Sequence, residues 1–140
     1  MNAKSIQLFN EGFARYQAGE PVEGVIPLFT DLSLQEPEEQ SIWVCLSWLY
    51  LLADQPVEAA RTARKAVFLD RDSAQAHINL ALALTDSKQQ GVNYHLLQAT
   101  ELLKTYPDQL PDVQENFQEA LKRRPTWTIA KTLQQKVIGT

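Results

Sequence analysis

Two histidines and one cysteine are the side chains of this 140-residue chain best suited to bind metals or to act as bases and nucleophiles. His77, His95 and Cys45 lie far apart in the sequence, and none has the close spacing of a metal-binding or nucleophile–base motif. The chain has only five glycines and no glycine-rich phosphate-binding loop. We therefore expect no catalytic residue, no metal site and no cofactor, and we interpret the chain as a non-enzyme.

Each of these three residues also has a purely structural interpretation. His77 occupies a core position of an expected helix, and His95 lies near the start of the next helix, where it is expected at the surface. Cys45 directly precedes the apolar Leu46 in the most hydrophobic segment of the chain. We expect it to be an inert buried thiol, and it has no partner for an internal disulfide.

The charge of the chain argues against a nucleic-acid-binding protein. The formal net charge is −4 and the pI is about 5.1, whereas a protein that neutralises phosphates needs a basic surface. The charge is unevenly distributed: residues 1–58 carry a net −7 and residues 59–140 a net +3. This asymmetry could orient a partner or a second copy of the chain, or it could reflect two solvated faces.

The length indicates one domain over residues 1–140, and the lone Cys45, which cannot form an internal disulfide, favours a cytoplasmic location. The N-terminal segment has no long apolar run and is expected to be neither a signal nor a transit peptide. The apolar block at 42–53 is shorter than the ~20 residues that span a bilayer. We therefore expect a core helix there and no direct membrane insertion.

Helical periodicity and an internal repeat are the clearest signals in the sequence. Apolar residues recur at spacings of three and four between Pro- and Gly-containing turns, which predicts an all-α fold. Phe9, Gly12 and Tyr16 are followed at steps of 34 residues by an equivalent trio in each of two further units. These trios are Trp43, Leu46 and Tyr50, then His77, Leu80 and Leu84.

A 34-residue helix-turn-helix unit with this pattern resembles the tetratricopeptide repeat family over about residues 6–107. The middle unit matches best, and its signature positions are held by Trp43, Leu46, Ser47, Tyr50, Ala59 and Ala66. The resemblance implies a short right-handed solenoid, a superhelix of antiparallel helix pairs with about eight helices. Its repeats would span about residues 6–39, 40–73 and 74–109, followed by capping helices within 111–138. Gly12, Phe13 and Arg71 depart from the family pattern.

The resemblance also implies which residues line the concave groove of the superhelix. In the family these positions lie on the first helix of each repeat. Here the groove positions are held by Asn10, Ala14, Gln17, Val44, Trp48, Leu51, Leu52, Gln75, Ile78, Leu82 and Thr85. The middle of the groove is therefore apolar, and it lacks the lysines and arginine with which some members of the family clamp a peptide carboxylate. An apolar wall suits an amphipathic helix or a hydrophobic segment, with Trp48 as the anchor.

Three arrangements of this apolar wall are open at the level of the sequence. A partner segment could bind to it, the C-terminal helices could cover it, or two copies of the chain could associate through it. The first predicts an adaptor or assembly chaperone that binds another protein, and the third predicts a structural homo-oligomer. The size and acidity also resemble those of the small tetratricopeptide chaperones of type III secretion translocators. A nucleic-acid role is disfavoured because the sequence has no regularly spaced polar side chains that could recognise successive bases.

Overall fold

A computed structural model describes residues 1–139 of the chain, in which every regular element is helical. The helices are α1 (Ala3–Gln17), α2 (Val22–Gln35), α3 (Gln40–Leu52), α4 (Pro56–Leu69), α5 (Ala74–Asp86), α6 (Val92–Thr105), the 3₁₀ turn η1 (Pro107–Gln109), α7 (Leu110–Arg123) and α8 (Thr128–Ile138). The prediction of an all-α fold with about eight helices is confirmed. None of the helices in these residues is both long and apolar enough to cross a membrane.

Local sequence signals explain where several of these helices begin. The Asn2 side chain accepts a hydrogen bond from the Ser5 backbone N–H (2.8 Å) at the start of α1. Ser73 does the same for Ala76 at the start of α5. Such N-cap side chains satisfy backbone donors that have no partner within the helix. Pro56 is the first residue of α4, where its missing N–H costs nothing.

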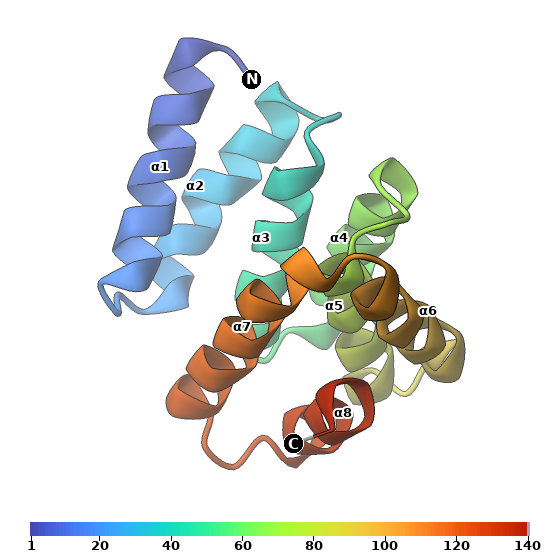
Figure 1. Cartoon of the computed structure of the whole chain (residues 1–140). Coiled ribbons are helices and arrows are strands. Elements are labelled where there is room, and N and C mark those ends of the chain that lie inside the picture. The colour runs from blue at the N-terminus through green and yellow to red at the C-terminus, as the bar shows by residue number, and fades with distance from the viewer. Residues whose placement is uncertain (140) are drawn as a thin grey trace.

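The first six helices form three consecutive pairs that stack side by side (Figure 1). Each helix packs against the next one along the chain, and α3 also contacts α5 across the stack. The face of α4 that meets its neighbours consists of small buried side chains, Ala59, Ala60, Ala63 and Ala66. Small residues let helices approach closely, which explains the tight packing of α3, α4 and α5. The division into repeats at the stated boundaries stays a prediction.

Gly12 shows why one of the departures from the family pattern is tolerated. A Cβ on Gly12 would lie 2.7 Å from Phe29 Cε2 and 2.8 Å from Leu28 Cδ2, closer than real contacts allow. The missing side chain leaves room for Phe29, which packs edge-to-face on Phe9 with ring centroids 5.4 Å apart. Phe29 thus fills the space that a larger residue at position 12 would take.

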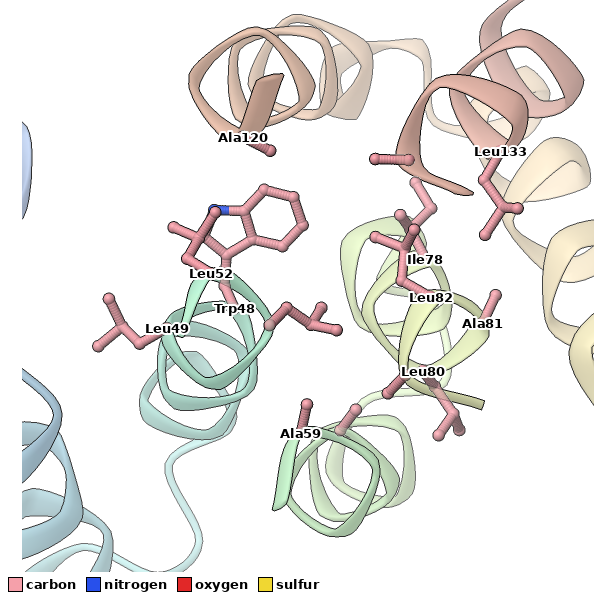
Figure 2. Packing of buried hydrophobic residues seen from close by; sticks show 14 of the residues in the cluster. Trp48, Leu49, Leu52, Ala59, Ile78, Leu80, Ala81, Leu82, Ala120 and Leu133 are labelled. Atoms are coloured by element: carbon pink, nitrogen blue, oxygen red, sulfur yellow. The ribbon is translucent and has the colours of Figure 1, made fainter. Parts of the chain in front are cut away.

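The last two helices fold back onto the stack and cover the middle of its concave side. Val113, Phe117 and Ala120 of α7 and Leu133 of α8 belong to the same core cluster as Trp48. Figure 2 shows Ala120 above Trp48 and Leu133 near Ile78 and Leu82. The C-terminal helices therefore occupy the apolar wall.

Five of the predicted groove residues are buried beneath the chain's own C-terminal helices, which is one of the three arrangements that the sequence leaves open. Trp48 is 5% exposed, Ile78 and Leu82 are fully buried, and Leu51 and Leu52 are buried as well. The physical reason is that α7 and α8 have apolar faces of their own, so covering the wall removes two unfavourable surfaces from water at once.

Two consecutive arginines at the end of α7 attach it to the stack. Arg123 donates hydrogen bonds to the backbone carbonyls of Tyr16 (2.6 Å) and Glu20 (3.0 Å) and lies 4.5 Å from the centre of the Tyr16 ring. Arg124 donates to the Leu51 carbonyl (2.7 Å). Tyr16 and Leu51 lie in the last turns of α1 and α3, where carbonyls lack helical partners. The same two carbonyls also accept the backbone N–H groups of Gly19 and Asp54, so the arginines add charge-assisted hydrogen bonds at two helix C-termini and hold α7 against the stack.

Candidate functional site: the concave cleft

The part of the concave side that α7 does not fill is a cleft of about 620 Å³. It lies between α7 and the helices α1, α3 and α5. Its lining residues are Phe13, Tyr16, Gln17, Val44, Gln75, Asp112, Glu115, Asn116 and Glu119. We call this space the concave cleft.

A smaller recess of about 90 Å³ adjoins the concave cleft and is mostly apolar. The two share Phe13, Tyr16, Val44, Gln75 and Asn116, and the recess is further lined by Phe29, Cys45, Trp48 and Leu49. A volume of this size can take the end of an apolar side chain or a few water molecules. The concave cleft therefore has an apolar extension that reaches toward the core.

Tyr16 forms the boundary between the cleft and the core. Its hydroxyl accepts a hydrogen bond from Trp48 Nε1 (3.2 Å), which satisfies the buried indole N–H. Burial raises the pKa of Tyr16 above its usual value of about 10, and the Trp48 hydrogen bond only partly opposes this. Tyr16 therefore stays neutral and presents a ring, not a charge, to the cleft.

A chain of amide groups joins α7 to the stack at one end of the cleft. Asn116 Nδ2 donates to Gln75 Oε1 (2.9 Å), and Gln75 Nε2 donates to Asn79 Oδ1 (2.7 Å). Asn79, which is fully buried, donates in turn to Ser47 Oγ (3.0 Å) and to the Val44 carbonyl (3.2 Å). These hydrogen bonds satisfy the buried Asn79 side chain on α5 and hold Gln75 in the cleft wall.

The two walls of the concave cleft differ in charge. The wall made by α1 and α3 is aromatic and apolar, with Phe13, Tyr16 and Val44. The α7 wall contributes Asp112, Glu115 and Glu119. Glu119 pairs with Arg123 (2.8 Å), whereas Asp112 and Glu115 form no ion pair within residues 1–139. No lysine or arginine lines the cleft.

The other predicted groove residues lie in three different places. Gln17, Val44 and Gln75 line the concave cleft, as described. Asn10 and Ala14 are exposed on α1 outside the cleft lining. Thr85 is partly buried, and its hydroxyl donates to the Ala81 carbonyl (2.8 Å). A role of these residues in binding a partner stays a prediction.

Sequence reasoning missed the residues that α7 contributes to the cleft. The family resemblance places the groove positions on the first helix of each repeat, and α7 lies after the last repeat. A usable signal was present, because Asp112, Glu115, Asn116 and Glu119 recur at helical spacing beside the apolar face formed by Val113 and Phe117.

Several solved structures have the same arrangement of helices as this chain. The type III secretion translocator chaperone SycD of Yersinia enterocolitica is 17% identical, with a TM-score of 0.68 over 97% of this chain and 96% of that chain. The MamA protein is 18% identical, with a TM-score of 0.67 over 99% of this chain and 88% of that chain. The TPR domain of Arabidopsis OM64 is 14% identical, with a TM-score of 0.58 over 96% and 93%.

The chain has a tetratricopeptide-repeat fold. No protein-family model matches the chain, and no curated protein sequence matches it. The resemblance read from the 34-residue spacing is therefore confirmed at the level of the fold.

On the tetratricopeptide-repeat scaffold the two histidines come together between α5 and α6, away from the concave cleft. His77 Nε2 lies 2.9 Å from the Arg71 carbonyl, which can only accept, so His77 carries its proton on Nε2. His77 Nδ1 is then the acceptor for His95 Nδ1–H at 2.9 Å. His77 is buried, as expected, whereas His95 is partly buried and paired instead of free at the surface.

This histidine pair predicts a loss of stability in mild acid. Burial lowers the pKa of both rings, that of His95 to about 4 with further contributions from His77 and Arg64. An unfolded histidine binds a proton near pH 6.5, so between pH 6.5 and 4 the unfolded chain binds more protons than the folded one. Stability that is present above pH 6.5 is therefore expected to fall as the pH approaches 4.

His95→Asn tests this expectation because the asparagine amide can still donate to His77 Nδ1 but cannot become charged. Thermal melts followed by circular dichroism at several pH values should show a smaller decrease in Tm between pH 7 and pH 4.5 for the variant than for the wild type. Identical decreases would contradict the assignment to His95.

The Cys45 thiol is not activated as a nucleophile. Burial raises the pKa of the Cys45 thiol to about 12, so the thiol is protonated at neutral pH. In the described part of the chain, no group of three or more His, Cys, Asp or Glu side chains is placed to hold a metal ion.

Proposed function

We propose that this chain is a protein-interaction module, an adaptor or assembly chaperone that holds a segment of a partner protein in the concave cleft. The observation that carries the proposal is the cleft itself. It is an open, partly aromatic space on the concave side of a helical stack, and its walls belong to elements fixed by the core and by the α7 arginines. Concave and largely pre-formed sites of this size are typical binding sites.

The known proteins with this fold support the same function. One of the similar structures is described as a translocator chaperone of type III secretion. A chaperone of that kind is the more specific version of the proposal, and the shared fold makes it reasonable without identifying the client.

Phe13 offers a direct test because it lines the cleft and is 41% exposed, so it can be replaced without emptying the core. Phe68, which is 70% exposed on α4 and lies outside the concave cleft, is a matched control. Tagged wild-type, Phe13→Glu and Phe68→Glu chains are compared in pull-downs from the native host, read out by quantitative mass spectrometry. We expect a specific partner to be retained by the wild type and by Phe68→Glu and to be lost with Phe13→Glu.

Equal retention by all three chains would contradict binding in the cleft. The folded state of each variant is checked by its helical circular dichroism and its Tm, so that lost binding is not confused with lost structure.

A homodimer is the second candidate, and it is favoured by the uneven charge of the chain and by the similarity to a structure described as a dimer. Sedimentation velocity over a range of concentrations distinguishes it. A dimer that Phe13→Glu dissociates and Phe68→Glu does not would assign the cleft to self-association.

A further inference from the structure

We infer that the segment bound in the concave cleft is cationic and amphipathic. It places an apolar side chain against Phe13 and Val44 and a lysine or arginine against Asp112 and Glu115. The inference rests on the proposed function, and it adds the chemical class of the partner segment.

The size of the cleft sets the kind of occupant. A volume of about 620 Å³ is within the range of sites that hold one small ligand or a few side chains. A folded partner would need an interface of about 800 Å² on each side. The concave cleft therefore fits a linear segment that inserts a few side chains better than it fits the surface of a folded domain.

The apolar wall requires that one inserted side chain be bulky and apolar. Phe13 is stacked on Phe9 with ring centroids 6.4 Å apart, and its ring also lies 6.2 Å from that of Tyr16. Its exposed part faces the cleft together with Val44 and the entrance to the smaller recess. Covering these surfaces with an apolar side chain removes them from water on both partners.

The α7 wall determines the charge of the segment. Asp112 lies in the first turn of α7, where an acidic residue is also favoured by the helix dipole, so its presence has a structural cause as well. Glu115 lies farther along the helix, and both carboxylates lack an ion pair in residues 1–139. No lysine or arginine belongs to the cleft lining, and the nearby Arg123 is paired with Glu119, so the unpaired charges that an incoming lysine or arginine meets are carboxylates, and an acidic segment is repelled.

The charge of the whole chain acts in the same direction. Residues 1–58, which include the apolar wall of the cleft, carry a net charge of −7, residues 59–140, which include the α7 wall, carry +3, and the net charge of the chain is −4. Fields of one sign around a concave site raise the association rate of ligands of the opposite sign. The net negative charge of the chain therefore also favours the approach of a basic segment.

Three labelled synthetic peptides test the inference. They have the same length and the same leucine and phenylalanine positions, and they carry lysine, glutamine or glutamate at the remaining positions. Fluorescence anisotropy with the purified full chain is expected to give an affinity for the lysine peptide about tenfold higher than for the glutamine peptide. The glutamate peptide is expected to bind most weakly.

Charge-reversed variants test whether the preference for the lysine peptide over the glutamate peptide arises from the cleft. In Asp112→Lys/Glu115→Lys we expect the order of the lysine and glutamate peptides to reverse. The control Glu23→Lys/Asp31→Lys makes the same change in net charge at exposed positions of α2 that do not line the cleft, and it is expected to keep the wild-type order. Circular dichroism checks that both variants are folded.

Four outcomes would overturn the inference. Equal affinities for the three peptides would leave the proposed function standing and remove the charge preference. A lysine preference that survives in Asp112→Lys/Glu115→Lys would be a general charge effect. Binding of none of the peptides would show that the cleft does not take such a segment, and the Phe13→Glu pull-down would then decide the proposed function separately. A wild-type dimer that Glu115→Lys dissociates would make a second copy the occupant.

Discussion

Trp48→Ala is expected to lower the free energy of unfolding by about 3–5 kcal/mol, as is typical when a large aromatic side chain is removed from a core. Trp48 is 5% exposed, belongs to the main core cluster, and lies beneath Ala120 of α7 (Figure 2). The substitution would leave a cavity and would remove the indole donor from the Tyr16 hydroxyl. Urea unfolding followed by circular dichroism measures the loss.

Phe13→Ala is the control for this prediction, since Phe13 is an aromatic residue on the same concave side that remains 41% exposed. Its removal is expected to cost clearly less than that of Trp48. Similar and small losses for both variants would mean that Trp48 is open to solvent and not covered by α7.

Phe117→Ala is expected to have an effect of the same size, about 3–5 kcal/mol, although it lies on a helix outside the repeats. Phe117 is fully buried and lies in the same core cluster as Trp48. If α7 were only a loosely attached cap, emptying its apolar face would have little effect on the stack. Thermal and urea unfolding of Phe117→Ala against the wild type decides between these cases.

The matched control on the same helix is Gln114→Ala, which changes an exposed side chain on the outer face of α7. Alanine is a good helix former, so this variant is expected to keep or slightly increase the stability. Comparable losses in Phe117→Ala and Gln114→Ala would argue that α7 is not part of the core.

The sequence predicted the architecture because the signals that determine it are local. The recurrence of Phe9, Trp43 and His77 at steps of 34 residues identifies the first helix of each pair without any knowledge of the contacts. Helix starts at Ser73 and Pro56 also follow from nearby residues. The helix starts depend on residues only a few positions apart, and the 34-residue recurrence can be read without any contact between the units, so a single sequence carries both.

The covering of Trp48 depends on contacts that a single sequence does not carry. The periodicity of α3 shows that Trp48 and Leu52 are apolar, and it leaves open whether the chain's own helices or a partner cover them. The residue that covers Trp48, Ala120, lies 72 positions away. Likewise, nothing in the local pattern indicates that Arg123 reaches the carbonyls of Tyr16 and Glu20. The helical spacing of Asp112, Glu115 and Glu119 is visible in the sequence, whereas the position of α7 beside α1 and α3 is not.

The attachment of α7 changes how this repeat protein is expected to unfold. In an open solenoid each repeat contacts only its neighbours, so stability is a sum of local terms and the ends can unfold first. Here Arg123 bonds to Tyr16 across 107 positions of sequence, and Trp127 donates to Asp86 of the third pair (3.2 Å). The end of the chain is thus tied to both its beginning and its middle. The first pair cannot separate without breaking the Arg123 hydrogen bonds to the last part of the chain, and this linkage favours a single cooperative transition over stepwise unfolding from one end.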